Sequence, residues 1–264
     1  MTGVLERSLA ILETLAANPE GMALATLSDQ LDIPRSAVHR LLAELIRFGY
    51  VRQPREQGEY VLTTKLISLG LTYLHSTGVV DLAQPILDRL ANETGELIRL
   101  AVTDGDKLTW VAKAQGTRTG LRYEPETGAV VRLCCTATGH AWLLTMSDEE
   151  ALELVARQGF GKKGEFGSNA PLTASALLKY LEQARARGFS TAADTYADGV
   201  AAIAAPVIRR GGQVAGVLTI SGPTLRFPDE RMLELAPDLL RAADELAASS
   251  AASPSFGAAR ASSA

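Results

Sequence analysis

The chain has 264 residues, of which 47% are hydrophobic and 21% are charged, and its formal net charge is −4. This length and apolar content suffice for two ordinary domains. The negative net charge argues against a general polyanion-binding protein, which is expected to be more basic. The two cysteines, Cys134 and Cys135, are adjacent, so they cannot form a disulfide framework that connects distant parts of the chain. They also lack the spacing of the cysteine pairs in a structural zinc site. Charged residues precede the first apolar run and no apolar run has the length of a membrane span, so we expect a cytoplasmic protein without a signal peptide.

The first predicted element is a helix at residues 4–17. Leu5, Leu9, Leu12 and Ala16 recur at helical spacing, and Asn18-Pro19 ends the run. Such an amphipathic helix can cover neighbouring helices or a second subunit.

Residues 25–31 and 34–48 are predicted to form a helix-turn-helix. Leu27 and Leu31 lie on one face of the first helix, Pro34 begins the second helix, and Gly49 offers its C-terminal exit. The apolar stripe of the second helix consists of Val38, Leu41, Leu42 and Leu45. The opposite face is polar and carries positive charge.

Residues 50–52 and 60–62 are short β-type runs joined by a charged loop, which predicts a hairpin of the kind called a wing. Residues 35–55 hold five arginines and one acid, Glu44, a local charge of 5 − 1 = +4, although residues 1–75 as a whole hold seven basic and eight acidic side chains. This favours a winged DNA-binding domain; the alternative is a dimerisation or protein-binding module with a solvated arginine face. The predicted contacts to double-stranded DNA are Arg35, Ser36, His39, Arg40, Arg52 and Arg55.

A helix from Thr63 or Thr64 to about Leu74 and a break at Gly78 indicate a linker before another helix near Asp81, with Pro85 expected in its first turn. We therefore expect a DNA-binding domain at residues 1–63, a linker helix at 64–78 and a second domain at 79–246. The Ala- and Ser-rich residues 247–264 are expected to be a disordered tail.

The second domain is predicted to be α+β, an antiparallel sheet flanked by helices. Strands are predicted at residues 97–102 and 108–112, joined at Asp104-Gly105-Asp106, and at 120–123, 189–191, 200–209 and 213–221. Helices are predicted at residues 138–145, 148–158 and 173–187, with a last one beginning near Asp229. Pro206 would be unsuitable for a central strand, so the strand around it should run along an edge or through a bulge.

Five segments together resemble the IclR family of bacterial transcriptional regulators. They are PRSAVHRLL, the wing GYV…GEYVLT, the turn TATGHA, and GVAAIAAPV followed by GQVAGVLTISGP. The resemblance covers nearly everything except the tail. It implies an N-terminal winged helix-turn-helix, a linker helix and a C-terminal effector domain with a GAF/PAS-like sheet, assembled as homodimers or homotetramers on palindromic operators.

The turn before the helix at 138–145 matches the family's effector site, with one departure: Cys134 and His140 stand where the family usually has His and Lys. Thr136 and Thr138 supply hydroxyl groups, and Gly139 allows close approach of the backbone. The free N–H groups and the positive end of the helix dipole at this helix start favour binding of a small acid through its carboxylate. The predicted effector-binding residues, several of them carried over by motif position, are Cys135, Thr136, Thr138, Gly139, His140, Asp194, Ala202, Thr219 and Ser221. The threonines can instead cap the helix, and Thr219 and Ser221 can be ordinary strand residues.

Trp110, Trp142 and Tyr123 could line an aromatic pocket or belong to the core. An unperturbed histidine is partly charged at neutral pH, so we expect either a less acidic or bulkier effector, or binding that tightens from about pH 8 to pH 6 as His140 protonates. The alternative is that His140 faces solvent or another subunit.

The resulting hypothesis is a ligand-responsive transcriptional regulator of a catabolic operon, without catalytic activity, cofactor or metal. One rival is a thiol-dependent hydrolase that uses Cys134 or Cys135 with His140 and Asp194 or Asp198. Another is a zinc- or redox-sensing regulator that uses the two cysteines and His140.

Overall fold

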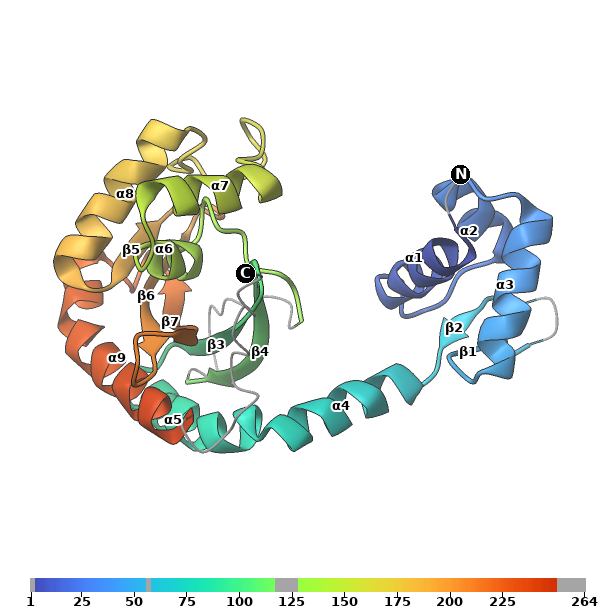
Figure 1. The fold of residues 1–264 in the computed structure, drawn as a ribbon, viewed down its shortest axis with the longest axis horizontal. Coiled ribbons are helices and arrows are strands. Elements are labelled where there is room, and N and C mark those ends of the chain that lie inside the picture. Colours follow the sequence, from blue (N-terminus) through green and yellow to red (C-terminus); the bar gives the residue numbers. More distant parts are fainter. Residues whose placement is uncertain (1–2, 56–57, 117–127, 251–264) are drawn as a thin grey trace. The chain divides into compact units, whose positions relative to one another are not determined.

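The computed structural model describes residues 3–55, 58–116 and 128–250 (Figure 1). The chain divides into two compact units, Met1–Ser76 and Thr77–Ala264. Within the described residues, no helix combines the length and the apolar character needed to cross a membrane.

The N-terminal unit is a winged helix-turn-helix. Its helices are α1 (Val4–Ala16), α2 (Leu24–Leu31) and α3 (Arg35–Arg47), and its wing pairs β1 (Val51–Arg52) with β2 (Val61–Leu62) in antiparallel register. The predicted stripe of α3 is buried against Ile11 and Leu15 of α1 and Leu27 of α2. The apolar spacing in the sequence therefore produces the predicted motif, because the three helices share one core.

The two units are connected through α4 (Lys65–Thr77) and α5 (Val79–Thr94), with Gly78 between them in the left-handed conformation at φ 63°. Because α5 begins at Val79 rather than near Asp81, Pro85 is the seventh residue of the helix. The prediction that Pro85 lies in the first turn is therefore wrong, and the proline removes one intrahelical hydrogen bond from α5.

The C-terminal unit is built on an antiparallel sheet with the strand order β4-β3-β7-β6-β5. The strands are β3 (Leu97–Asp104), β4 (Lys107–Gln115), β5 (Ser190–Ala193), β6 (Val200–Ile208) and β7 (Val214–Pro223). The predicted β3–β4 hairpin is confirmed, since Asp104 pairs with Lys107 across the turn. The strand predicted at residues 120–123 lies outside the described residues.

Helices cover both faces of this sheet (Figure 1). Two of them, α5 and α9 (Asp229–Ser250), pack on one face against side chains that include Leu218 and Ile220 of β7. The other face carries α6 (Ala137–Leu143), α7 (Asp148–Gln158) and α8 (Ala174–Arg187). Since α9 extends to Ser250, residues 247–250 are helical, which corrects the start of the predicted disordered tail; residues 251–264 lie outside the described residues.

Pro206 lies in β6, which has β7 on one side and β5 on the other. However, β5 pairs only with residues 201–204 of β6, so within the described residues Pro206 has a strand partner on the β7 side alone. A register shift follows at once between Val207 and Ile208. The prediction of a local edge or bulge at Pro206 is therefore confirmed.

Candidate functional site

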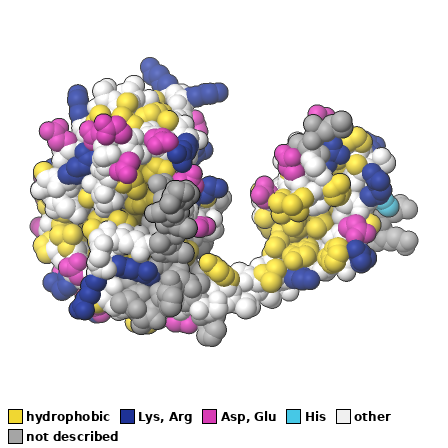
Figure 2. Space-filling model, in the orientation of Figure 1, with side chains coloured by type: hydrophobic (Ala, Val, Ile, Leu, Met, Phe, Trp, Pro, Cys, Tyr) yellow, Lys and Arg dark blue, Asp and Glu magenta, His cyan; other side chains and the backbone are white. Residues whose placement is uncertain are grey.

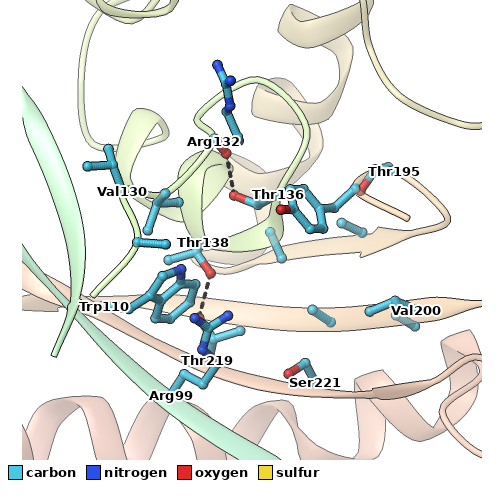
Figure 3. Close-up of a pocket in the computed structure, with 17 residues that line it drawn as sticks. Arg99, Trp110, Val130, Arg132, Thr136, Thr138, Thr195, Val200, Thr219 and Ser221 are labelled. Carbon is cyan, nitrogen blue, oxygen red and sulfur yellow. Dashed lines mark hydrogen bonds between the residues drawn. The ribbon is translucent and has the colours of Figure 1, made fainter. Parts of the chain in front are cut away.

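A cavity of about 380 Å³ lies between the sheet and α6 in the C-terminal unit (Figure 3). Its lining comes from all five strands or the loops beside them, and from the segment that leads into α6. The lining residues are Arg99, Trp110, Ala129, Val130, Val131, Arg132, Thr136, Ala137, Thr138, Ala192, Thr195, Tyr196, Val200, Ala201, Ala202, Thr219 and Ser221. Short side chains on β5 and β6, such as Ala192 and Ala202, leave the space open.

Arg99 and Trp110 form one side of the cavity. Arg99 is 7% exposed, and its guanidinium carbon lies 3.5 Å from the centroid of the Trp110 ring. In this position the cation stacks on an aromatic face and is largely withdrawn from water, which strengthens its attraction for an anion. Trp110 was one of the predicted pocket aromatics, whereas the sequence reasoning missed Arg99.

Three hydroxyl groups lie on neighbouring elements beside this pair. The side-chain oxygens of Thr138 on α6 and Thr219 on β7 are 2.8 Å apart and hydrogen-bonded. Ser221, two residues further along β7 and on the same face, is 4% exposed, and its hydroxyl has no hydrogen-bond partner among the described residues. Ala202 faces Ser221 across the β6–β7 pairing.

Thr136 combines both roles considered for it. Its hydroxyl accepts a hydrogen bond from the Gly139 amide at 2.9 Å, donates one to the Arg132 carbonyl at 2.6 Å, and its side chain lines the cavity. It is therefore the N-cap of α6, which leaves fewer free amides at the start of this short helix than the sequence suggested.

The charged side chains among the described lining residues are Arg99 and Arg132, and no carboxylate is among them. Figure 3 shows the Arg132 side chain extending away from Thr138, whereas Arg99 lies beside Trp110 and Thr219. Arg99 is thus the cation that faces the interior, and the cavity is suited to an anion with an apolar body.

The structure does not place His140 in the cavity lining. His140 is fully buried, its Nε2 lies 2.7 Å from the Cys134 carbonyl oxygen, and its ring centre is 5.1 Å from that of Tyr180. Burial lowers the pKa of His140 to about 4, against a smaller opposing effect of the hydrogen bond to Cys134. The ring is neutral at neutral pH and donates from Nε2, because a carbonyl oxygen can only accept. The expectation of a partly charged histidine that binds the effector is corrected accordingly.

Three other predicted effector residues also lie outside the lining. Cys135 is fully buried. Gly139 serves packing, since a Cβ there would come within 2.4 Å of the Leu133 carbonyl oxygen. Asp194 adopts φ 55° and accepts a hydrogen bond from the Gly199 amide at 2.6 Å, so it shapes the loop after β5. Its neighbours Thr195 and Tyr196, which the sequence reasoning missed, line the cavity instead.

Of the aromatic residues predicted to line a pocket, Trp142 and Tyr123 are not among the described lining residues of this cavity. Trp142 lines a separate hollow, together with Met146 and the β3–β4 and β6–β7 turns. Tyr123 lies outside the described residues.

The residues of the rival hypotheses are not assembled into a site. A hydrogen bond to Cys134 and burial both raise the pKa of the Cys135 thiol, and the same hydrogen bond lowers the pKa of the Cys134 thiol; both side chains are fully buried, which disfavours attack on a substrate. Asp198 instead accepts a hydrogen bond from the Ser168 amide at 2.7 Å. In the described part of the chain, no group of three or more His, Cys, Asp or Glu side chains could hold a metal ion.

The predicted DNA contacts are all exposed in the N-terminal unit. Arg35, Ser36, His39 and Arg40 lie on α3, and Arg52 and Arg55 lie in the wing region. Arg47 differs from them, because it is ion-paired with Glu44 at 2.6 Å and stacks on Phe48. The polar face of α3 therefore offers Arg40 rather than Arg47 as its accessible central cation.

A winged helix-turn-helix joined to a ligand-sized cavity in a second domain defines a ligand-responsive DNA-binding regulator. The family model of the bacterial transcriptional regulator IclR C-terminal domain matches residues 71–248, and that of the IclR helix-turn-helix domain matches residues 4–55. The chain belongs to the IclR family of bacterial transcriptional regulators.

Individual relatives agree with this assignment. The chain is 30% identical over 244 residues to the transcriptional repressor IclR of Escherichia coli (strain K12), covering 92% of this chain and 88% of that protein. The IclR transcriptional regulator from Alicyclobacillus acidocaldarius shares the fold with a TM-score of 0.79 at 21% identity, covering 95% of this chain and 99% of that one. An IclR homologue from Microbacterium hydrocarbonoxydans, crystallised with 4-hydroxybenzoate, has a TM-score of 0.76 at 20% identity, covering 95% and 100%.

Proposed function

We propose that this protein controls transcription in response to a small organic acid, most simply an aromatic one, that binds in the cavity beside Arg99. The observation that carries the proposal is the charge of the lining, in which the described charged side chains are the two arginines, Arg99 and Arg132, without a carboxylate. An anion bound beside Arg99 gains a charge-assisted contact with a cation that is largely withdrawn from water.

In the proposed complex the carboxylate lies against Arg99, within reach of the Ser221 hydroxyl and the Thr138–Thr219 pair. Ser221 then gains the partner that it lacks among the described residues. The apolar body of the acid packs against Trp110. The 4-hydroxybenzoate held by a protein of the same fold supports this class of ligand.

Isothermal titration calorimetry on the full chain tests the proposal. We expect 4-hydroxybenzoate or benzoate to bind and the uncharged 4-hydroxybenzamide to bind at least about tenfold more weakly, since a charge-assisted hydrogen bond contributes roughly twice as much as a neutral one. Arg99→Met should abolish the preference for the acid, whereas Arg132→Met, which removes the arginine that extends away from Thr138, should preserve it. Equal binding of acid and amide by the unaltered protein would refute the proposal.

The DNA-binding part of the proposal assigns residues 1–63 to operator recognition, 64–78 to the linker and 79–246 to effector binding. Exposed α3 enters a major groove, with the arginines of the wing on the phosphate backbone. Because a regulator of this kind acts on the chromosome, we propose a cytoplasmic location. A gel-shift series with DNA from the regions flanking its gene, with and without the bound acid, tests this step.

We also propose a homodimer, or a tetramer made of dimers, on a two-fold operator. Exposed hydrophobic side chains gather on one side of the N-terminal unit (Figure 2). Val4 and Leu5 of α1 are both 72% exposed, and α4 presents Ile67, Leu71 and Tyr73 at 60% or more. An apolar surface of this kind is typical of a protein interface, and two recognition helices read a longer site than one.

A further inference from the structure

Residues 159–170, here called the strap, connect α7 to α8 beside the cavity. Gly159, Gly161 and Gly164 of the strap have φ values of 88°, 77° and 84°, a left-handed region that favours glycine. Repeated glycines of this kind allow a segment to change its path with little steric cost.

Hydrogen bonds connect the strap to both walls of the cavity. Near its start, the Cys134 thiol donates to the Phe160 carbonyl at 3.6 Å, next to the segment that leads into α6. Near its end, the Gly167 amide donates to the Tyr196 carbonyl at 3.1 Å, and the Asn169 amide donates to the Asp194 carbonyl at 2.8 Å. The strap therefore joins the segment before α6 to the loop after β5.

Phe166 lies at the point where these two walls meet. Its ring centre is 6.1 Å from that of Tyr196, and the Arg132 guanidinium carbon is 5.8 Å from the Phe166 ring. Tyr196 and Arg132 both line the cavity, the first from the loop after β5 and the second from the segment before α6, whereas Phe166 is not among the lining residues. Tyr196 is 43% exposed, so it forms part of the cavity mouth rather than of the core.

We propose that the strap is a gate, with Phe166 as the latch that holds Tyr196 and Arg132 together over the cavity. Release of Phe166 opens the mouth, so the latch sets how fast the effector enters and leaves. Arg99 and the hydroxyl groups beside it select the chemical class of ligand, and these groups are separate from the latch. As far as it concerns the effector, the inference rests on the proposed function.

Two glycines of the strap provide a matched pair of test variants. A Cβ at Gly161 would come within 2.3 Å of the Phe166 ring, whereas a Cβ at Gly164 would meet nothing within 4 Å. Both positions have similar positive φ values, so Gly161→Ala and Gly164→Ala introduce comparable backbone strain. Only Gly161→Ala displaces the latch. Phe166→Ala is a second variant that removes the latch outright.

Cavity access can be measured without any ligand through the fluorescence of Trp110, which lines the cavity. In a Trp142→Phe background, acrylamide should quench Trp110 about three- to tenfold faster in Gly161→Ala and Phe166→Ala, as expected for loss of one aromatic contact. Gly164→Ala should match the unaltered background. Circular dichroism confirms that each variant is folded. Unchanged quenching in a folded Phe166→Ala protein overturns the gate.

Stopped-flow dissociation of 4-hydroxybenzoate gives the kinetic counterpart. We expect dissociation about three- to tenfold faster in Gly161→Ala and Phe166→Ala, with a smaller change in the equilibrium constant because association also speeds up. Slower exchange, or an equal effect in Gly164→Ala, contradicts the latch. Ser221→Ala separates the two proposals, since it removes a hydroxyl that the proposed carboxylate would contact and should weaken binding of the acid, while the quenching of Trp110 by acrylamide should stay as in the unaltered background. Failure of the acid to bind would overturn the effector class alone, and the quenching experiment would still decide the gate.

Discussion

Acidification should destabilise the C-terminal unit through His140. Burial lowers the pKa of this histidine to about 4, against an ordinary value of about 6.5 in the unfolded chain. Below pH 6.5 the unfolded chain therefore takes up a proton that the folded protein resists. The contribution of neutral His140 is complete above about pH 6.5 and is lost progressively as the pH falls toward 4.

The magnitude follows from the size of the shift. About 2.5 pKa units at 1.36 kcal/mol per unit give a full loss of about 3 kcal/mol, of which about 2 kcal/mol is lost between pH 7 and pH 5. His140→Gln removes the titration and keeps a side-chain N–H that can donate to the Cys134 carbonyl. Urea denaturation at pH 7 and pH 5 should show that the free energy of unfolding of the variant falls by about 2 kcal/mol less than that of the unaltered protein.

His39→Gln is the matched control, because it removes an imidazole that is exposed on α3. It should leave the pH dependence of unfolding of the C-terminal unit unchanged. If His140→Gln lost as much stability between pH 7 and pH 5 as the unaltered protein, the argument from burial would be refuted. Between pH 8 and pH 6, His140→Gln should leave the pH dependence of effector affinity unchanged, because His140 stays neutral in this range.

Three other expected outcomes concern DNA binding, assembly and the cavity. Arg40→Ala should weaken operator binding in a gel-shift series more than Arg47→Ala, since Arg47 is already paired with Glu44. Sedimentation at micromolar concentration should show at least a dimer, and Leu5→Glu should shift it toward a monomer; a monomeric unaltered protein, with and without DNA, would remove the two-fold model. Thr219→Val should lower the free energy of unfolding by about 1–3 kcal/mol by stranding the Thr138 hydroxyl, and adding Thr138→Val should recover part of that loss in thermal denaturation.

The elements that could be predicted from the sequence are those in which the apolar spacing and the boundary residues indicate the same secondary structure. The stripe of α3 and the turn at Gly105 are of this kind, because local geometry and burial favour the same structure. The position of Pro85 was misjudged because the start of α5 depends on Gly78, whose left-handed conformation begins a helix that no side chain caps. Helix boundaries without a capping side chain carry little signal in the sequence.

The cavity was harder to predict, since its lining is brought together by the order of the strands. Arg99 was missed although a signal was present: a charged residue in the apolar run Leu97–Asp104 is unusual for a strand that is buried on both faces. His140 was misassigned because its place in a motif says nothing of its direction. At about 100° per residue, positions 138 and 140 of α6 point about 200° apart, so a helix that turns Thr138 toward the sheet turns His140 away.

Ser221 connects the stability of the C-terminal unit to the occupancy of the cavity. A buried hydroxyl without a partner costs about 1–3 kcal/mol, and alanine at the same place would avoid that cost. The residues facing Ser221 are Ala202 on β6 and Leu97 on β3, and neither side chain can form a hydrogen bond with the hydroxyl. Thr219, two residues away on the same face, already has its partner in Thr138. We infer that the arrangement of β6 and β7 leaves one polar position for a ligand to satisfy, so that an acceptor bound beside Arg99 stabilises the sheet as well as occupying the cavity.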